Sequence, residues 1–590
     1  MITRPPDLQD DQDLTNVKRH VQTSYYVEGE GLWTLDEAQQ PRCIWPEAAA
    51  EVRMFRFSRL GPVGEPTDPA LNHELARAMT AAGDEADSSA NRQPRIPAGF
   101  TYLGQFVDHD LTLDATAVAL GQDVTVDELV DNRSPALDLD SVYGRGPGNA
   151  QDQRFYAADG IKLKTGTTAA VSLANIPGVP DATNPNPPHS ASTNVNRDGF
   201  DLPRVGTGAT KAAERTALIP DTRNDENLAV AQTHLAFIHF HNRVVDTLAT
   251  RGVPSLVLFE AARSEVVQHY QWMLRHDHLP RIVDPDIVDD VFTHGRKFFE
   301  VSGGPTGTMP IEFSVAAYRL GHSMIRGAYQ WNRVFRAGGP LGIATLLQLF
   351  AFTGTSGNFA PPTDPAQLDN PNSGTLIRLP TNWIVDWRRL HDFSVIPNFA
   401  DVVLPDQETN EAKRIDTRLV NPLDHLPAGT FAGREQNLPQ DDIQRNLAFR
   451  NLTRANMVKL ASGQQMADFF GVKQLTPAEI LNGNGDGSGA NLTAEDSLNQ
   501  VQQDALVAST PLWFYILREA EINHGKLGQV GGRIVAEVFH RAMEISTYSI
   551  VRNPHWRPQF GPDPSTFRMV DLLLFAFNND LALLNPLGDA

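Results

Sequence analysis

The sequence predicts a mainly α-helical protein with one large domain, long loops and little β-structure. Apolar residues recur with helical spacing over long stretches, notably at 228–249 and 256–279. Alternating patterns typical of half-buried strands are scarce. With 590 residues, 41% of them hydrophobic, the chain can bury a large core. Residues 1–60 are mixed and interrupted by prolines, so we expect an arm packed on a main domain at 61–590.

Composition excludes several classes of partner and site. The formal charge is −21, from 50 Lys and Arg against 71 Asp and Glu, which disfavours nucleic acid and anionic membranes. Cys43 is the single cysteine, so no internal disulfide and no cysteine-built metal site can form. The sequence has neither a recognisable signal peptide nor an apolar run long enough for a membrane span. We expect a soluble protein, cytoplasmic or secreted by another route, with the oligomeric state left open.

The stretch Tyr102–Leu111 is apolar except for a few chemically capable side chains. Gln105, Asp108 and His109 fall within an arc of about 100° if the stretch is helical. A histidine with an amide one turn before it can move a proton and hold a water or a peroxide. Asp110 points away from that face and could serve a separate hard cation. The alternative interpretation is a satisfied core histidine.

A loop after this stretch places oxygen-bearing side chains at alternating positions. These are Ser134, Asp138 and Asp140, with backbone carbonyls between them. Such spacing is how a calcium loop is built. The alternative is a solvated acidic turn.

The long helical pattern at 228–249 follows a polar segment in which Asp221 or Thr222 could cap the helix. In that segment Arg223 and Glu226 stand three residues apart, so both can face one object. The helix carries His234 and His241 on one face, but no third ligand of fixed spacing accompanies them, and a zinc site is not expected.

Further helical patterns cover 309–329, 441–460, 531–550 and 569–577. The first contains the pair Arg319/His322 and the second the pair Asn451/Arg454, again three residues apart. Helices that aim such pairs at one flat anionic cofactor would supply an axial ligand, partners for carboxylates and an acid–base group. Haem fits this inventory.

Six motifs in order resemble the animal-type haem peroxidases of the peroxidase–cyclooxygenase superfamily, in a bacterial-looking form. The resemblance runs from about residue 95 to 580. The motifs are Gly104-Gln-Phe-Val-Asp-His-Asp110, Asp138-Leu-Asp-Ser-Val-Tyr-Gly144, Asp221-Thr-Arg-Asn-Asp-Glu226, His241-Asn-Arg243, Tyr318-Arg-Leu-Gly-His322 and Asn451-Leu-Thr-Arg454.

The resemblance implies a haem b site with named roles. His322 would be the proximal iron ligand, and Asn451 would accept its second ring proton. His109 would be the distal base, Gln105 would hold a distal water or small anion, and Arg223 would complete the distal site. Arg319 and Arg454 would pair with the haem propionates.

The resemblance also implies calcium and permits covalent haem. The calcium ligands would be Asp110, Ser134, Asp138, Asp140 and the carbonyl of Ala136, an arrangement that would fix the distal helix in register. Asp108 and Glu226 match the two carboxylates that form ester links to haem in mammalian members. Asn227 stands where one mammalian member has a methionine that forms a sulfonium link, which excludes that bond.

The implied function is a haem peroxidase. It would reduce hydrogen peroxide and oxidise small electron donors (phenols, halides or thiocyanate) through a ferryl haem. The alternative is a fatty-acid dioxygenase of the same superfamily, which uses a tyrosyl radical three residues before the proximal histidine. Here that position is Arg319, and the adjacent Tyr318, rotated by about 100°, is not expected to face the same cavity. A calcium-stabilised binding protein with vestigial haem is a third candidate, disfavoured because His109, Arg223 and His322 are all present.

Overall fold

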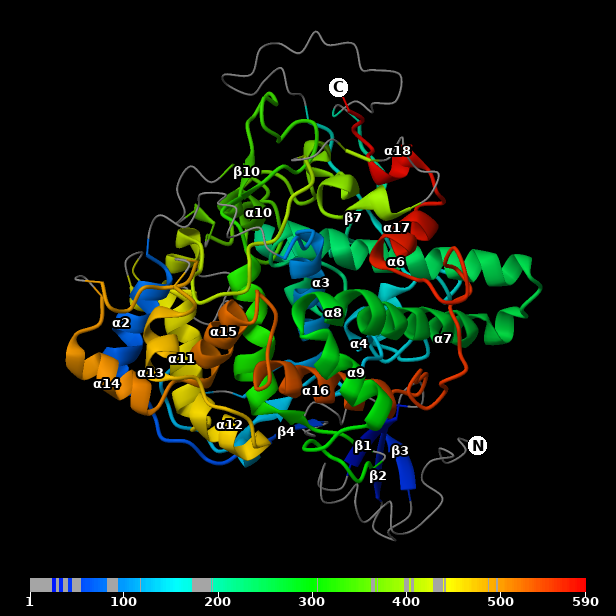
Figure 1. Ribbon diagram of the computed structural model, residues 1–590. Helices are drawn as coiled ribbons and strands as arrows, with labels where there is room; N and C mark the ends of the chain where they lie inside the picture. Colours follow the sequence, from blue (N-terminus) through cyan, green and yellow to red (C-terminus); the bar gives the residue numbers. More distant parts are fainter. Residues whose placement is uncertain are drawn as a thin grey trace.

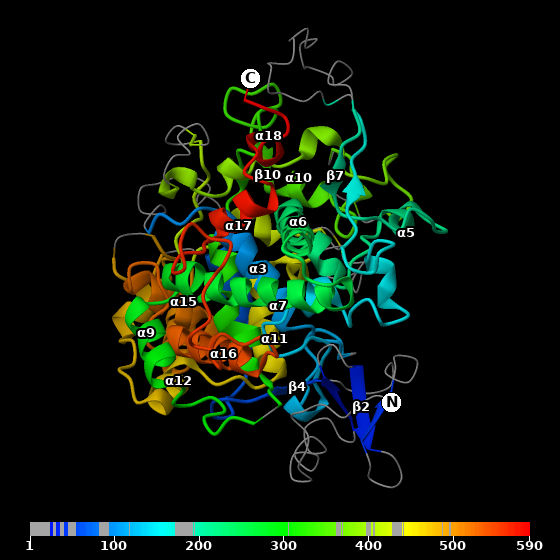
Figure 2. The same ribbon diagram turned by 90° about the vertical axis from the view of Figure 1, so that its right-hand side faces the viewer.

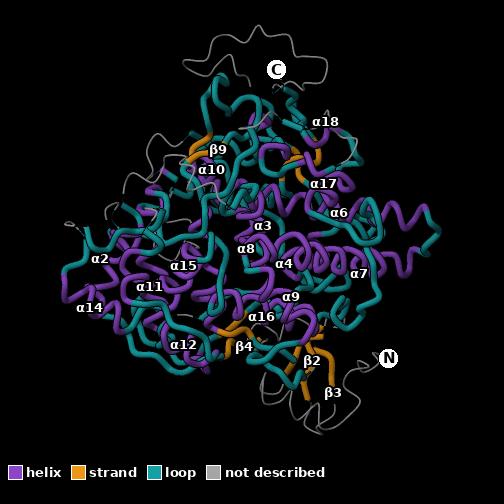
Figure 3. The backbone as a smooth tube through the Cα atoms, viewed as in Figure 1, coloured by secondary structure: helices purple, strands orange, loops and turns teal. Residues whose placement is uncertain are grey.

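Helices make up most of the regular structure, and the strands form only small sheets, so the predicted fold class is confirmed (Figures 1 and 3). The computed structural model describes residues 24–27, 31–35, 41–44 and 55–589, except 82–93, 117, 172–192, 194, 305, 362–366, 369, 397–402, 405–407, 428–438, 440–441, 486–487 and 495–496. Most of the predicted arm at 1–60 therefore lies outside the described residues. No helix in the described ranges is both long and apolar enough to cross a membrane.

The centre of the molecule is helix α3, Gly99–Leu111, which contains the apolar stretch at 102–111. It packs against α6, Leu228–Thr250, which in turn packs against α7, Ser255–Met273, and α17, Met569–Ala576 (Figure 2). Ten of the thirteen residues of α3 are buried, so this helix lies inside the protein rather than on its surface.

The cap of α6 differs from the prediction. Asn227, not Asp221 or Thr222, accepts a hydrogen bond from the backbone N–H of Val230 at the helix start. Asp221 instead caps a short 3₁₀-helix, Thr222–Asp225, by accepting from the N–H of Arg223. The polar segment thus forms a separate turn, and α6 begins only at Leu228.

The predicted helix at 256–279 is confirmed but changes character near its end. After α7 the chain forms a π-helical turn, Leu274–His278, and then the short helix α8, Leu279–Ile282. Pro280 lies in the first turn of α8 and lacks an N–H, which removes the α-helical bond to the preceding turn. The π-turn carries His278 into the interior.

The prediction of one continuous helix at 309–329 is wrong. Both ends of the segment are strands, β8 (Met309–Pro310) and β9 (Ala328–Tyr329), and between them a π-helical turn, Glu312–Ala316, leads into a 3₁₀-helix, Ala317–Met324. Strand pairing at both ends overrides the helical pattern. In a 3₁₀-helix, side chains three residues apart eclipse one another, so Arg319 and His322 share one face.

The remaining long helical patterns are confirmed with shorter bounds. The pattern at 441–460 becomes α11, Leu447–Met457, capped by Asn446, and it packs against α2, Pro69–Met79. The patterns at 531–550 and 569–577 become α16 and α17. The other helices are α4 (Asp140–Tyr143), α5 (Lys211–Arg215), α9 (Pro285–His294), α10 (Leu346–Ala351), α12 (Gly463–Phe470), α13 (Pro477–Asn482), α14 (Gln500–Ala508), α15 (Leu512–Ile522), α16 (Gly531–Ile545) and α18 (Leu581–Leu584).

One of the small sheets connects the regions that the sequence singles out. Its central strand β4, Phe55–Ser58, pairs with β5, Val130–Asp131, just before the predicted calcium loop, and with β8, which precedes His322. The last residues of the predicted arm are therefore hydrogen-bonded to the main body. The other strands are β1 (Ser24–Val27), β2 (Gly31–Leu35) and β3 (Pro41–Ile44) in one antiparallel sheet, β6 (Gly166–Thr167) with β7 (Asp198–Asp201), and β9 with β10 (Ala344–Thr345).

Candidate functional site

A cavity of about 570 Å³ lies among α3, the 3₁₀-helix 317–324, α11 and the turn that precedes α6. It collects every residue that the sequence predicts for catalysis and cofactor binding. These are Gln105, Asp108, His109, Arg223, Glu226, Arg319, His322, Asn451 and Arg454. They come from four segments spread over about 350 positions of the chain, so the fold brings them together as the motifs require.

The side chain of His109 is held by a buried amide. Its Nδ1–H donates to Oδ1 of Asn224 at 2.9 Å, and Nδ2 of Asn224 donates to Nδ1 of His234 at 3.0 Å. This arrangement leaves the lone pair of His109 on Nε2. Burial, with Arg223 nearby, lowers the pKa of His109 to about 4, so the ring is neutral at neutral pH. His109 is therefore able to accept a proton in the cavity.

Gln105 and Glu226 form a polar group beside the His109 ring. Nε2 of Gln105 donates to Oε1 of Glu226, and Oε1 of Gln105 accepts from Nδ2 of Asn227 at 2.7 Å. Oε1 of Glu226 lies 3.7 Å from Nε2 of His109. Burial raises the pKa of Glu226 to about 7. Asn227 was not predicted as a site residue, although its place directly after Glu226 could have suggested it.

The guanidinium of Arg223 is held in place beside this site by hydrogen bonds. Its guanidinium binds the carboxylate of Asp221 through Nε at 3.0 Å and Nη2 at 2.6 Å, and Nη2 also donates to the carbonyl of His109 at 3.1 Å. Asp221, which the sequence suggests only as a helix cap, also accepts from Nε of Arg133 at 2.9 Å. Neither Asp221 nor Arg133 was predicted to support the site.

His322 is the second histidine of the cavity. Its Nδ1 lies 2.8 Å from Nδ2 of Asn451, so the predicted pair is formed. In this orientation the amide donates to Nδ1, opposite to the predicted sense, and a 180° rotation of the amide would present its oxygen instead. Burial, followed by the charges of Arg319 and Arg454, lowers the pKa of His322 to about 3. A neutral imidazole of this kind is a good metal ligand.

Besides Arg223, three arginines line the same cavity. Arg319 and Arg454 were predicted, and Nε of Arg319 donates to the carbonyl of Ser314 at 2.9 Å. Arg450, one turn before Arg454 on α11, also lines the cavity and was missed. Its spacing of four residues from Arg454 could have revealed it. Positive charge of this density favours an anionic ligand.

Tyr318 corrects a prediction. It lines the same cavity as His322, and its hydroxyl is hydrogen-bonded to Nε2 of His278 at 3.1 Å. The expectation assumed α-helical geometry, whereas residues 312–324 form a π-turn and a 3₁₀-helix. The cavity is also wide enough to be bordered by more than one face of this segment.

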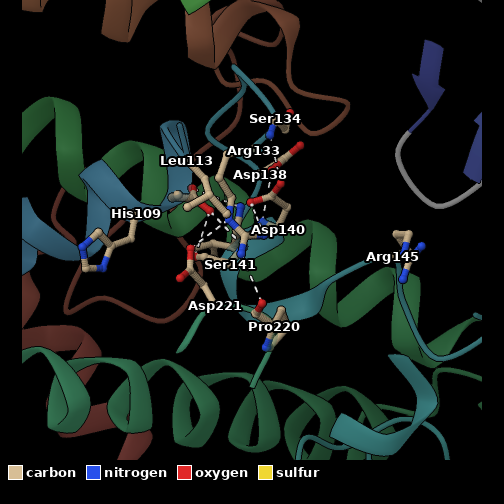
Figure 4. A network of polar contacts seen from close by, with 12 residues as sticks. His109, Leu113, Arg133, Ser134, Asp138, Asp140, Ser141, Arg145, Pro220 and Asp221 are labelled. Carbon is tan, nitrogen blue, oxygen red and sulfur yellow. Dashed lines mark hydrogen bonds and ion pairs between the residues drawn. The ribbon is translucent and has the colours of Figure 1, made fainter. Parts of the chain in front are cut away.

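Carboxylates of the predicted calcium site gather at the C-terminal end of α3. Figure 4 labels two of them, Asp138 and Asp140. Asp110, Asp138 and Asp140 each offer an oxygen, and these atoms lie within 4.8 Å of one another. Ser134 Oγ accepts from the N–H of Ala136 at 3.2 Å, and the Ala136 carbonyl accepts from the N–H of Asp138 at 3.1 Å. The three predicted carboxylates therefore come together, and Ser134 and Ala136 lie in the loop that carries two of them.

Burial makes negative charge costly in this cluster. Burial, with the Asp140 charge, raises the pKa of Asp110, and burial raises the pKa of Asp140 to about 6. Asp110 accepts hydrogen bonds from the N–H of Leu139 at 3.2 Å and from the hydroxyl of Ser141 at 3.1 Å. Within the described residues, Oδ1 of Asp140 is buried without a hydrogen-bond partner. Such a set of oxygens suits a hard cation.

Comparison with known proteins agrees with these observations. Residues 117–336 match the model of the animal haem peroxidase family. A curated "Peroxidase-like protein" from Margaritifera margaritifera is 29% identical over 113 residues, which is 18% of this chain and only 14% of that protein. The chain thus matches about one seventh of the length of that relative.

A solved structure shares this fold at low sequence identity. Peroxidase A from Dictyostelium discoideum superposes with a TM-score of 0.51 and 13% identity, covering 90% of this chain and 94% of that one. A fatty acid alpha-dioxygenase from Oryza sativa has a TM-score of 0.47 and 11% identity, with 89% and 81% coverage.

The family match includes Asp138, Arg223 and His322, while His109 and Asn451 lie outside it and join the site through the fold. The motif order, the mainly helical fold and the matched segment agree. Residues 117–336 match the animal haem peroxidase family, so the predicted resemblance of the chain to these proteins is confirmed over that segment.

Proposed function

We propose that this protein is a haem-dependent peroxidase, an oxidoreductase that reduces hydrogen peroxide and oxidises a small donor such as a phenol, a halide or thiocyanate. One observation carries the proposal. A neutral His109 with a fixed Nε2, the guanidinium of Arg223 and a second neutral histidine, His322, line one buried cavity. Residues 61–590 would form the catalytic domain and residues 1–60 its N-terminal arm.

The residues of the cavity fit haem b. Nε2 of His322 has no hydrogen-bond partner among the described residues, and a Cβ added to the neighbouring Gly321 would meet no atom within 4 Å. Space therefore opens beside a free imidazole nitrogen. Arg319, Arg450 and Arg454 would bind the two carboxylates of the cofactor. When bound, haem would supply the redox chemistry.

His109 would move the proton. Its Nε2 would take a proton from one peroxide oxygen and return it to the departing oxygen, a contribution of about 10²–10⁴ in rate. The Asn224 hydrogen bond at Nδ1 keeps the ring in the required tautomer. Because His109 is neutral, it is ready for this step without prior loss of a proton.

Arg223 and Gln105 would position and stabilise the reacting oxygens. Arg223 would offset negative charge on the departing oxygen. Gln105 uses one N–H for Glu226, and its second N–H can hold a water or peroxide. Asp108 and Glu226 both line the cavity, so ester links to haem are open to test by mass.

Calcium would bind to Asp110, Ser134, Asp138, Asp140 and the carbonyl of Ala136. The three acidic groups and the buried Oδ1 of Asp140, which accepts no hydrogen bond among the described residues, support this assignment. Because Asp110 follows His109 directly on α3, the ion would fix the C-terminal end of the distal helix.

Tyr318 supports one alternative, a fatty-acid dioxygenase. Its ring lines the cavity, and its hydroxyl has a proton acceptor in His278. Against this alternative, Arg319 occupies the position three residues before His322 where such enzymes need tyrosine.

Spectra and substrate assays test the proposal. The purified protein supplied with haem should show a histidine-ligated haem spectrum that changes on addition of peroxide, and it should oxidise a small phenol. Rapid dioxygen uptake with a polyunsaturated fatty acid, lost in Tyr318→Phe, would favour the alternative. Failure to bind haem would reject both.

A further inference from the structure

Four charged side chains form a continuous chain from the acidic cluster to the cavity. Figure 4 shows the first three, Asp140, Arg133 and Asp221. Oδ1 of Asp140 lies 3.6 Å from Nη1 of Arg133, whose Nε donates to Asp221 at 2.9 Å. Asp221 binds Arg223 at 2.6 Å, and Arg223 donates to the carbonyl of His109. The acidic cluster and the distal site are thus linked by alternating charges.

The inner members of this chain are shielded from water. The side chain of Asp221 is 3% exposed and that of Arg133 is 9% exposed. Buried ion pairs are screened much less than surface pairs, so a change at one member alters the balance at its neighbour. Arg133 also donates through Nη2 to the carbonyl of Pro220 at 3.2 Å, which fixes its fork between the two carboxylates.

Each inner member divides its interactions between two partners. Arg133 lies between Asp140 and Asp221, and Asp221 lies between Arg133 and Arg223. A cation drawn to Asp140 would compete with Arg133 for that carboxylate. Arg133 would then pair with Asp221 alone, and the ion pair between Asp221 and Arg223 would weaken.

We propose that Arg133 and Asp221 are positioning residues that couple cation binding at the acidic cluster to the placement of Arg223 in the cavity. The inference rests on the proposed function for the role of Arg223 and for the ion. Binding of the cation shifts Arg133 toward Asp221 and releases the guanidinium of Arg223 toward the peroxide site. The same linkage runs in the reverse direction, because coupling between two sites is reciprocal at equilibrium.

Reciprocity gives a test that needs no turnover. The probe is Ca²⁺ alone, titrated by calorimetry into the full chain after removal of metal. In Arg223→Gln, Asp221 pairs with Arg133 alone, so Arg133 no longer holds Asp140. The affinity for Ca²⁺ should therefore rise by about fivefold or more. In Asp221→Asn, Arg133 pairs with Asp140 alone, so the affinity for Ca²⁺ should fall by about the same factor.

Arg133→Lys is the matched control that separates the proposed coupling from a long-range electrostatic effect of the substituted charges on Ca²⁺. It keeps the positive charge but loses the planar fork that spans two carboxylates. In the Arg133→Lys background, both effects should fall below about twofold. If both persist there, the field of the charges explains them and the proposed coupling is wrong.

Two further outcomes also decide the question. If the intact chain binds no Ca²⁺, there is no ion to couple and the inference fails. If Asp221→Asn does not fold, Arg223→Gln in the two Arg133 backgrounds still decides it. Absence of peroxidase activity together with Arg133-dependent changes in Ca²⁺ affinity would reject the proposed function and leave the coupling standing.

Discussion

Nδ1 of His109 donates a hydrogen bond to Oδ1 of Asn224 at 2.9 Å, deep inside the protein. The amide of Asn224 donates in turn to Nδ1 of His234, and this second hydrogen bond fixes the orientation of the amide. Ring orientation and tautomer of His109 therefore depend on a residue that does not line the cavity.

Asn224→Ala should slow the reaction with peroxide by about tenfold or more, because residues that orient a functional histidine typically contribute that much. Haem content should stay unchanged. Stopped-flow absorbance after mixing haem-loaded protein with peroxide measures the rate. Asn227→Ala, which removes the neighbouring amide but not the His109 bond, is the control for general damage, and an equal loss in both variants would argue against a specific role of Asn224.

His322→Ala should lose most haem or give a spectrum without a nitrogen axial ligand. The reason is that His322 combines a neutral ring with an open space beside it. Haem content per chain and the absorption spectrum check this. His278→Ala removes another buried cavity histidine and should retain the axial ligand, whereas an unchanged spectrum in His322→Ala would reject the assignment.

His109→Ala should depress the peroxide reaction by about 10²-fold or more, since it removes the proton acceptor. Tyr318→Phe should leave the peroxidase rate nearly unchanged, because only the hydrogen bond to His278 is lost. Steady-state oxidation of a phenol by peroxide gives both rates. A large loss in Tyr318→Phe would show that the tyrosine takes part in the reaction.

Acid should inhibit the reaction with peroxide. Burial lowers the pKa of His109 to about 4, so Nε2 carries a free lone pair above that pH and a proton below it. Near neutral pH, His109 is in its neutral form, so its titration should not change the second-order rate constant. Below pH about 4, the rate constant should fall about tenfold per pH unit. Rapid pH-jump mixing separates this effect from unfolding, and a profile with no acid limb down to pH 3 would be inconsistent with His109 as the base.

Metal removal should lower thermal stability and peroxidase activity together. An ion that binds only the folded chain stabilises it by about 2.7 kcal/mol at 100 times its dissociation constant. Without it, oxygens of Asp110, Asp138 and Asp140 lie within 4.8 Å of one another, and Arg133 pairs with Asp140. Thermal unfolding with and without chelator, followed by calcium return, measures the effect. A protein that contains no cation and is indifferent to chelation would exclude the site.

The sequence was sufficient for features that depend on local pattern. Helix α6 begins and ends within a residue of the predicted bounds, because its apolar face and length are both clear. Nine residues of the cavity were also predicted from their motifs, whereas Asn227 and Arg450 were missed. Arg133 and Asn224 were missed as supporting residues because their partners lie 88 and 115 positions away. The prediction of one helix at 309–329 was wrong because the spacing of apolar residues does not reveal that both ends of the segment pair as strands.

The 3₁₀ geometry at Ala317–Met324 has a consequence for variation in this segment. Arg319 and His322 align because three residues complete a turn there, whereas in an α-helix they would diverge by about 60°. Gly321 disfavours the α-helix, and alanine would fit at this position without a clash. Gly321→Ala would thus meet no protein atom and yet favour an α-helix, which would move the Arg319 guanidinium away from the face that carries the His322 ring. Substitution here is therefore limited by helix pitch even where the protein leaves space.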